Sequence, residues 1–388
     1  MGTSGAGRAA DRIARLAGLS NDLPSFLDQA QEAIGAVVPC MDSPYWFTLD
    51  PASILITSIY GRGCEAPIDV MLQAEYLAGD DHANRCSAVA ANPAGVQTLH
   101  EATGGDPSRS RIYREIMQPM GIAQEAVVAL RTASGENWGV LSLVRGPGQP
   151  PFEGDELRFL RAVAPHLGQG IRRGLLVGEA TDPQWPDSPG LVVVDSDLQE
   201  ESRSPGVERW LAELPGEWED RGPLPPAVLS VAAQALRTAE GDGPPGEVAM
   251  ARVLSRSGRW IVLHGAALAG TGAMRAAVIV EPAGPARIVP LLMAVYGLTE
   301  REQDVTRLVL QGDSTTQIAR SLYVSPHTVQ QHLKSIFEKT GVRSRRELVG
   351  KVFFSHYEPR VRDNDSRARA GKPLRGGPFP LQDPPEEP

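Results

Sequence analysis

The sequence predicts a multi-domain α+β protein, in which two antiparallel-sheet domains precede an all-α domain of four short helices. Three observations lead to this fold class. Two long segments each contain predicted strands interleaved with helices, and a linker rich in Pro, Asp and Gly separates them. The segment that follows them has helical periodicity alone. A chain of 388 residues also has the length of two to four domains.

The first twenty residues are mostly small or polar. We expect residues 1–20 to form a flexible leader, in which only the run DRIARLAGL has the composition of a weak helix. The first domain is predicted over residues 21–176. Its main expected elements are a helix from Asn21 to Pro39, strands Tyr45–Leu49 and Ile54–Ile59, a helix Asp69–Leu77, strands Ala126–Leu130 and Trp138–Val144, and a helix from Gly154 to Leu176.

This order of helix, two strands, helical middle, hairpin and long closing helix resembles a GAF-type sensor domain. The hairpin and the run PFEGDELRFLRAVAPHLGQGIRR carry most of the resemblance. The resemblance implies a central antiparallel sheet with a ligand pocket on one face, but it names no ligand. Trp46, Phe47 and Trp138 lie on predicted strands and are the candidates for ligand contact, with plain core packing as the alternative.

The closing helix of this domain has apolar residues spaced by three and four positions. Two interpretations fit this seam. It could pair with its own copy in a homodimer, or the helix could pack on the sheet of its own domain. The seam consists of Leu157, Leu160, Ala164, Leu167 and Ile171.

Residues 177–189 form the predicted linker, and residues 190–283 form the second domain. Two strands, helices and then three strands are expected in it, an order that resembles a PAS-like fold. The predicted elements are strands Gly190–Asp195 and Leu198–Ser202, a helix Val207–Leu214, an amphipathic helix Ala227–Thr238, and strands Val248–Ser255, Trp260–Leu268 and Ala276–Glu281.

The final domain, residues 290–354, has clear start and stop signals for four helices. Three helices begin at capping boxes, the remaining one begins with Pro at its first position, and a Gly follows its end. The boxes are Thr299 with Glu302, Ser314 with Gln317, and Ser344 with Glu347; the other helix is bounded by Ser325, Pro326 and Gly341.

The third helix of this domain is expected to have two faces. Val329, Leu333, Ile336 and Phe337 recur at helical spacing and should face a core. The opposite side carries polar side chains that can hydrogen-bond to base edges in a major groove. A short helix, a tight turn at Tyr323–Ser325 and a second helix of this kind form a helix-turn-helix.

The segment resembles the LuxR-type DNA-binding domain, also called GerE- or FixJ-type. The runs LTEREQDV, QIARSLYVSPHTVQQHLKSIFEKTGV and SRRELV carry the resemblance, within about 57 of the 388 residues. It implies a four-helix domain that binds two-fold sites on double-stranded DNA as a dimer. A helical bundle with a solvated polar face is the alternative. The resemblance implies base contacts from Gln330, Gln331 and Lys334, and phosphate contacts from Thr328, Lys339 and Arg343.

The net charge of the chain is −9, which is unusual for a DNA-binding protein taken whole. The charge is unevenly distributed, because Leu291–Phe354 contains nine basic and six acidic residues and has a net charge of +3. An acidic body joined to a basic C-terminal domain is expected of a regulator whose body stays away from phosphates.

Other kinds of site find little support in the sequence. The cysteines Cys40, Cys64 and Cys86 suggest no disulfide framework, and with His82 they lack the close spacing of structural zinc ligands. No phosphate-binding loop or nucleophile elbow occurs. We therefore expect no enzyme activity, no metal and no cofactor. No apolar run is long enough to span a membrane, so we expect a cytoplasmic protein without a membrane partner, and residues 355–388 should form a disordered tail.

Together these patterns predict a transcriptional regulator whose sensor domains gate a helix-turn-helix. The expected partners are double-stranded DNA, a second copy of the chain in a homodimer, a small-molecule effector and RNA polymerase. Two alternatives stay open. One is a scaffold or regulator controlled by a partner protein with no small ligand, and the other is a redox switch based on a cysteine.

Overall fold

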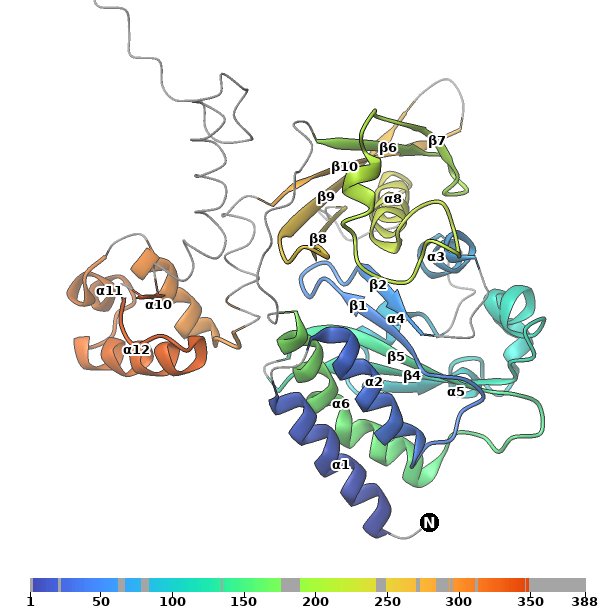
Figure 1. Cartoon of the computed structure of the whole chain (residues 1–388), viewed down its shortest axis with the longest axis horizontal. Coiled ribbons are helices and arrows are strands. Elements are labelled where there is room, and N and C mark those ends of the chain that lie inside the picture. Colours follow the sequence, from blue (N-terminus) through green and yellow to red (C-terminus); the bar gives the residue numbers. More distant parts are fainter. Residues whose placement is uncertain are drawn as a thin grey trace, which may run out of the picture.

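The computed structural model describes residues 3–19, 22–61, 67–77, 84–133, 135–175, 189–241, 249–269, 273–283, 293, 296–310, 313–345 and 347–348. Two five-stranded antiparallel sheets succeed one another along the chain, and a helical unit follows them (Figure 1). The predicted fold class is confirmed. Most of the predicted linker and the whole predicted tail lie outside the described residues.

The first sheet has the strand order β2-β1-β5-β4-β3, so the first strand lies beside the closing hairpin. In β1, Phe47 pairs with Ile59 of β2 on one side and with Val140 of β5 on the other. Both faces of the central strands are buried. The strands are β1 Tyr45–Leu49, β2 Ile56–Tyr60, β3 Val96–Thr98, β4 Gln124–Arg131 and β5 Asn137–Arg145.

Helices α1 (Thr3–Gly18), α2 (Leu23–Gly35) and α6 (Gly154–Gly174) pack together on one face of this sheet (Figure 1). The expectation of a flexible leader is therefore wrong for residues 3–18. Ile13 of α1 is fully buried, and Arg12 forms an ion pair with Glu32 of α2. The leader folds because its apolar positions, although mostly alanine, share one helical face.

The apolar seam of α6 packs inside its own domain. Leu160, Leu167 and Ile171 are fully buried against the sheet and against α1 and α2. Gly170 lets α2 approach closely, because a Cβ at this position would lie 1.9 Å from the ring of Phe26. Of the two interpretations of the seam, packing on its own domain is confirmed, and the seam is not available to a second copy.

Short helices cover the other face of the first sheet, and they surround the cavity described below. Among them, the segment Tyr113–Met117 is a single turn of π-helix, a form that is rare and often found at functional sites. The helices are α3 Ile68–Tyr76, α4 Cys86–Ala91 and α5 Leu99–Ala102.

The second sheet has the order β7-β6-β10-β9-β8. In both sheets the strands therefore lie in the order second, first, fifth, fourth, third. The predicted sequence of two strands, helices and three strands agrees with this arrangement, while the PAS-like assignment stays a prediction. The strands are β6 Gly190–Val194, β7 Glu200–Arg203, β8 Met250–Leu254, β9 Trp260–Leu268 and β10 Arg275–Pro282, and the helices are α7 Glu208–Leu211 and α8 Pro226–Ala239.

Helix α8 lies between the two sheets (Figure 1). The expectation of an amphipathic helix is wrong here, because every residue from Pro226 to Leu236 is buried. One side of α8 packs on β9 and β10, and the other side packs on α3 and β2 of the first domain. A helix that is buried on all sides indicates a position inside a larger core, so the two sheet domains share one hydrophobic interior.

A buried ion pair also joins the two sheet domains. The carboxylate of Asp50, which follows β1, accepts hydrogen bonds from Arg252 of β8: from its backbone N–H at 2.8 Å, from Nε at 3.0 Å and from Nη2 at 2.7 Å. The Asp50 side chain is fully buried. The bidentate pair of the carboxylate with the guanidinium, together with the backbone hydrogen bond, fixes the end of β1 against the second sheet.

The C-terminal unit has its own small core. Val305, Val329 and Ile336 are fully buried in it, whereas Phe337 is only half-buried at its edge, so the expectation that Phe337 faces the core holds in part. Leu348, from the start of the predicted fourth helix, also packs into this core, and most of that helix lies outside the described residues. The three described helices are α10 Glu300–Leu310, α11 Thr315–Ser321 and α12 Pro326–Thr340.

Candidate nucleic-acid interface and sensor cavity

Helices α11 and α12 form a helix-turn-helix. The turn between them bends at Tyr323, whose φ of 55° lies in the left-handed region and whose side chain is 95% exposed. Sequence reasoning placed a turn at Tyr323–Ser325 but missed this exposed aromatic side chain. No sequence signal announces it, because left-handed φ is uncommon for a bulky residue.

Local capping sets the start and end of α12. The Ser325 hydroxyl accepts the backbone N–H of Thr328, with Pro326 at the first helical position, and Gly341 ends the helix with φ 67°. The capping boxes of α10 and α11 form as predicted, through Thr299 with Glu302 and Ser314 with Gln317. Glu347 accepts instead from the backbone N–H of Arg343, so the last predicted box is only half formed.

The three predicted base-reading residues share one exposed side of α12. Gln330, Gln331 and Lys334 are all exposed, and they lie away from the buried Val329 and Leu333. Gln331 Nε2 lies 3.2 Å from His327 Nε2, which links two side chains one helical turn apart. This side of α12 can present amide and ammonium groups to the edges of bases.

The predicted phosphate-binding residues differ in their surroundings. Arg343 is exposed just beyond α12, and Thr328 is half-buried with its hydroxyl 2.8 Å from that of Ser325. Lys339, by contrast, places its Nζ 2.6 Å from Glu302 Oε2 of α10, while Ser335 donates to Glu302 Oε1. The ammonium group of Lys339 is therefore already engaged within the domain.

The carboxylate of Glu302 is a structural element of this domain. Burial alone would raise its pKa, but hydrogen bonds from Lys339, Ser335 and the backbone of Thr299 hold the pKa below its ordinary value. One buried carboxylate thus ties the start of α10 to the C-terminal half of α12.

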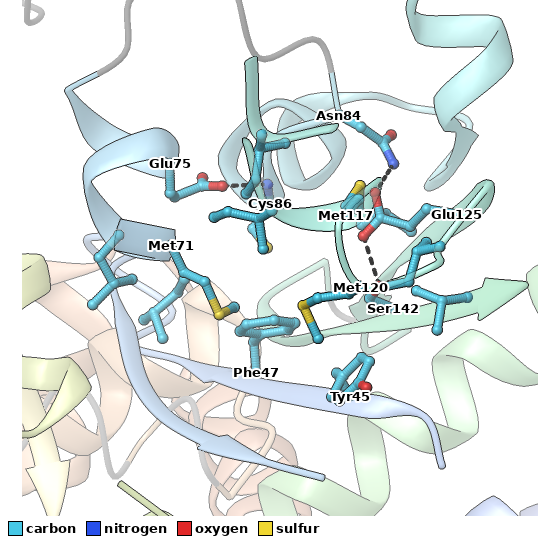
Figure 2. A pocket seen from close by; sticks show the side chains of 17 residues that line it. Tyr45, Phe47, Met71, Glu75, Asn84, Cys86, Met117, Met120, Glu125 and Ser142 are labelled. Carbon is cyan, nitrogen blue, oxygen red and sulfur yellow. Dashed lines mark hydrogen bonds between the residues drawn. The ribbon is translucent and has the colours of Figure 1, made fainter. Parts of the chain in front are cut away.

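A cavity of about 80 Å³ lies between the first sheet and the short helices on the face opposite α1, α2 and α6 (Figure 2). Its walls come from β1, β2, α3, the start of α4, the π-helical turn, β4 and β5. Most of the lining side chains are apolar, including three methionines, and the polar ones are few. The residues drawn and labelled are Tyr45, Phe47, Met71, Glu75, Asn84, Cys86, Met117, Met120, Glu125 and Ser142.

Of the three aromatic residues predicted to contact a ligand, Phe47 alone lines this cavity. Trp46 and Trp138 are 1% exposed and belong to the core on the opposite face, under α1, α2 and α6. Trp46 and Phe47 must face opposite ways because successive strand residues alternate between faces. Neither tryptophan lines this cavity, and Trp138 instead lines a second pocket, with Thr48, Arg252 and Trp260. Ligand contact by the three aromatic residues stays a prediction.

Glu125 at the start of β4 is the main polar group of the cavity. Its Oε1 accepts from the Ser142 hydroxyl and its Oε2 from the Asn84 amide, each at 2.7 Å (Figure 2). Burial, together with the neighbouring carboxylate of Glu75, raises the pKa of Glu125 to about 7. Sequence reasoning missed this residue, because a single Glu at a strand start carries no motif.

Glu75 of α3 has a different role. Its carboxylate accepts the backbone N–H groups of Cys86 at 2.9 Å and Ser87 at 3.0 Å, and the Ser87 hydroxyl at 3.0 Å. It therefore caps the start of α4 from outside that helix. Burial still raises its pKa above the ordinary value, against the effect of these hydrogen bonds.

Stability should depend on pH through Glu125. Because its folded-state pKa lies above the ordinary 4.5, the native state binds more protons than the unfolded state between those values, and stability falls as pH rises toward 7. The Gln side chain of Glu125→Gln does not titrate, so this variant does not lose stability in the same way. Its free energy of unfolding, relative to that of wild type, should therefore rise by up to about 3 kcal/mol between about pH 4 and pH 8. Urea unfolding followed by tryptophan fluorescence measures this difference.

The matched control for this experiment is Glu115→Gln, which alters an exposed carboxylate of the same domain. Its stability relative to wild type should stay nearly constant over the same pH range. An equal relative stability of Glu125→Gln at both pH values would contradict the assignment of a raised pKa to Glu125.

The two described cysteines are poorly suited to redox chemistry. Burial raises the pKa of the Cys86 thiol well above its usual range, and burial also raises that of Cys40, whose Sγ donates to the Asp42 carbonyl. The reactive thiolate is thereby disfavoured at both. Cys64 and His82 lie outside the described residues. Among the described residues, no group of three or more His, Cys, Asp or Glu is placed to hold a metal ion.

Two family models match the chain. The model described as "Bacterial regulatory proteins, luxR family" matches residues 297–352, and the model described as "GAF domain" matches residues 47–171. In the part of the chain that the structure describes, no helix has the length and apolar character to cross a membrane.

Several relatives match over short segments. A Mycobacterium tuberculosis protein named as an HTH-type transcriptional regulator is 52% identical over 52 residues, 13% of this chain and 6% of that protein. The monoamine regulon transcriptional regulator of Klebsiella aerogenes is 43% identical over 56 residues, 14% and 25% of the two chains. The HTH-type transcriptional regulator MalT of Yersinia pestis is 39% identical over 61 residues, 16% and 7%. The matches thus span between 6% and 25% of these relatives.

Among solved structures, the crystal structure of the E. coli DhaR(N)-DhaL complex matches 73% of this chain and 91% of the other, at 14% identity and a TM-score of 0.21. A score this low supports no statement about fold or function. The two family matches, however, coincide with the cavity-bearing sheet and with the helix-turn-helix. This chain therefore carries a GAF domain in residues 47–171 and a LuxR-type helix-turn-helix domain in residues 297–352.

Proposed function

We propose that this protein is a sequence-specific DNA-binding transcriptional regulator whose sensor region controls its helix-turn-helix. One observation carries the proposal: α12 is rigidly capped and presents Gln330, Gln331 and Lys334 together on an exposed side. Two amide side chains and an ammonium group on one helix have the donors and acceptors that read base edges in a major groove. A merely solvated helix face needs no such amide pair.

A homodimer is part of this proposal. One recognition helix provides only a few base contacts, and specific sites usually consist of two half-sites about one helical turn apart. Because the α6 seam is buried within its own domain, the dimer contact must use another surface. Sedimentation of the full chain, alone and with a two-half-site duplex, measures this association. Contact with RNA polymerase belongs to the same proposal, without an assigned surface.

Helix α3 is the element that supports control by a ligand. Met71, Leu72 and Glu75 line the cavity from this helix. The other side of α3 contacts the second domain, because Asp69 accepts from the Gln199 amide at 2.6 Å and Gln73 donates to the Asp197 carbonyl. A ligand that moves α3 would therefore also move the second domain and α8, which packs against α3.

A different contact joins the first sheet domain to the DNA-binding domain. Tyr296, just before α10, packs against the core under α1, α2 and α6 and also against the core of the C-terminal unit. Beside it, the Arg172 guanidinium near the end of α6 lies so close to Gly297 that a Cβ there would be 2.6 Å from Nη1. A shift of α6 would therefore reach the start of the helix-turn-helix directly.

The base-reading proposal predicts the behaviour of Lys334→Ala. A preferred duplex is first selected from random sequences with wild-type protein, and affinities for this duplex and a scrambled one are then compared at fixed salt. The variant should lose about 1–3 kcal/mol of discrimination between the two duplexes, because a base contact is removed. Its fold should be unchanged, since Lys334 is exposed.

Arg307→Ala is the matched control, because it removes one positive charge from the same domain but on α10, where Arg307 pairs with Asp304. It should leave the discrimination between duplexes unchanged. The proposal of base reading by α12 fails if Lys334→Ala and Arg307→Ala retain the same discrimination as wild type. The proposal of a sequence-specific regulator fails if wild-type protein selects no preferred sequence.

A further inference from the structure

The charged side chains that line the GAF cavity are all acidic among the described residues. They are the carboxylates Glu75 and Glu125, and no described lining residue is Lys, Arg or His. A ligand with a negative charge would meet two buried acids and no cationic side chain among the described lining residues; Arg85, which acts on Glu75, is not part of that lining. The lining therefore selects against carboxylates and phosphates and favours a neutral or positively charged ligand.

Of the two acids, Glu125 has more spare capacity to accept hydrogen bonds. Glu75 is held by two backbone N–H groups and a hydroxyl at the start of α4. Glu125 accepts from two neutral side chains, one on each oxygen, although a carboxylate has about four acceptor sites. Each of its oxygens can thus accept one more donor from a ligand in the cavity.

The size and walls of the cavity limit the rest of the ligand. The volume of about 80 Å³ is roughly half that of an engineered cavity that admits benzene, so only a short hydrocarbon fits without rearrangement. Met71, Met117 and Met120 are among the lining side chains in Figure 2, and methionine adapts its shape readily to an apolar group. A compact alkyl group matches these walls.

We infer that the cavity binds a small alkylammonium ion, with its nitrogen hydrogen-bonded to Glu125 and its alkyl group among Met71, Met117 and Met120. The ammonium group supplies three hydrogen-bond donors and a positive charge that can pair with the Glu125 carboxylate. The role of this ion as the effector of the regulator rests on the proposed function. Its binding to the cavity does not, and can be measured without DNA.

Three probes with one short carbon skeleton test the inference: propan-1-amine, propan-1-ol and propanoate. Calorimetric titration of the full chain at about pH 8, where Glu125 is largely ionised, gives their affinities. The amine should bind about 10- to 100-fold more tightly than the alcohol, as expected for a hydrogen bond to a charged group, and the carboxylate should bind least.

Glu125→Gln should reduce the amine affinity to that of the alcohol, because the amide keeps the shape and loses the charge. Glu115→Gln, in an exposed ion pair of the same domain, should bind the amine like wild type. Tryptophan fluorescence melting of each variant shows that the sheet domains are folded. A second variant, Met117→Gln, keeps Glu125 but makes the wall polar, and should weaken the amine and the alcohol equally.

The inference is overturned if the amine does not bind at millimolar concentration, if the alcohol or the carboxylate binds as tightly, or if folded Glu125→Gln binds the amine as well as wild type. A chain that binds the amine but selects no DNA sequence would retain the inference and lose the proposed function. A chain that selects a DNA sequence but binds no amine would lose the inference alone.

Discussion

Ile336→Ala should unfold the DNA-binding domain and abolish operator binding while leaving the two sheet domains folded. Ile336 is fully buried among Val305, Val329 and Leu333. Truncation of a buried Ile to Ala costs about 2–5 kcal/mol. A domain of about 56 residues has a total stability of about 3–8 kcal/mol, so the loss is comparable with the whole stability of the domain.

The chain allows the two regions to be observed separately. All six tryptophans precede residue 261, and five of them lie in the described parts of the two sheet domains, so their fluorescence does not report on the helix-turn-helix. In Ile336→Ala, the fluorescence melting curve should match wild type, while amides of residues 300–345 should exchange rapidly with deuterated solvent. Glu338→Ala, at an exposed position of the same helix, should change neither. Slow exchange in α12 of the Ile336→Ala variant would contradict the assigned core.

Capping explains why this domain was predictable from sequence. The contacts of Ser314 with Gln317 and of Ser325 with Thr328 join residues three apart, and Gly341 acts on its own helix. Such local signals are present in any short window of sequence. The role of Lys339 was not predictable, because its partner Glu302 lies 37 residues away and only the folded domain brings them together.

In the sheet domains, by contrast, the site could not be predicted from local sequence signals. Alternation along β1 places Trp46 and Phe47 on opposite faces, but the strand alone does not reveal which face holds a cavity. Helix α1 gave a weak signal, because its packing uses alanines such as Ala9 and Ala17. The cavity polar group was also hidden, since Glu125, Asn84 and Ser142 come from three separate segments.

Long-range charge pairing was equally hidden, and it leads to a second large expected effect. Asp50→Ala should destabilise the joined sheet domains by about 3–5 kcal/mol, because it leaves the cation of Arg252 buried without its partner. The backbone N–H of Arg252 would also lose its acceptor. These two residues are separated by 202 positions, so nothing in either segment of sequence announces the pair.

Urea unfolding followed by tryptophan fluorescence measures this effect, because Trp46 of β1 and Trp260 of β9 lie in the two domains that the pair joins. Glu115→Ala is the control, since it breaks the exposed ion pair with Arg111 and should cost less than about 1 kcal/mol. A cost for Asp50→Ala as small as that of the control would show that the pair is not buried in solution.

A double substitution separates the contribution of the charges to stability from the contribution of side-chain packing at this site. In Asp50→Leu with Arg252→Met, no buried charge is left unpaired, and apolar side chains of similar length fill the site. Stability should return to within about 1–2 kcal/mol of wild type, because a buried ion pair and a well-packed apolar pair are often nearly equivalent. If the double variant is as unstable as Asp50→Ala, the hydrogen bond that the Asp50 carboxylate accepts from the backbone N–H of Arg252, and not the charge, holds the sheets together.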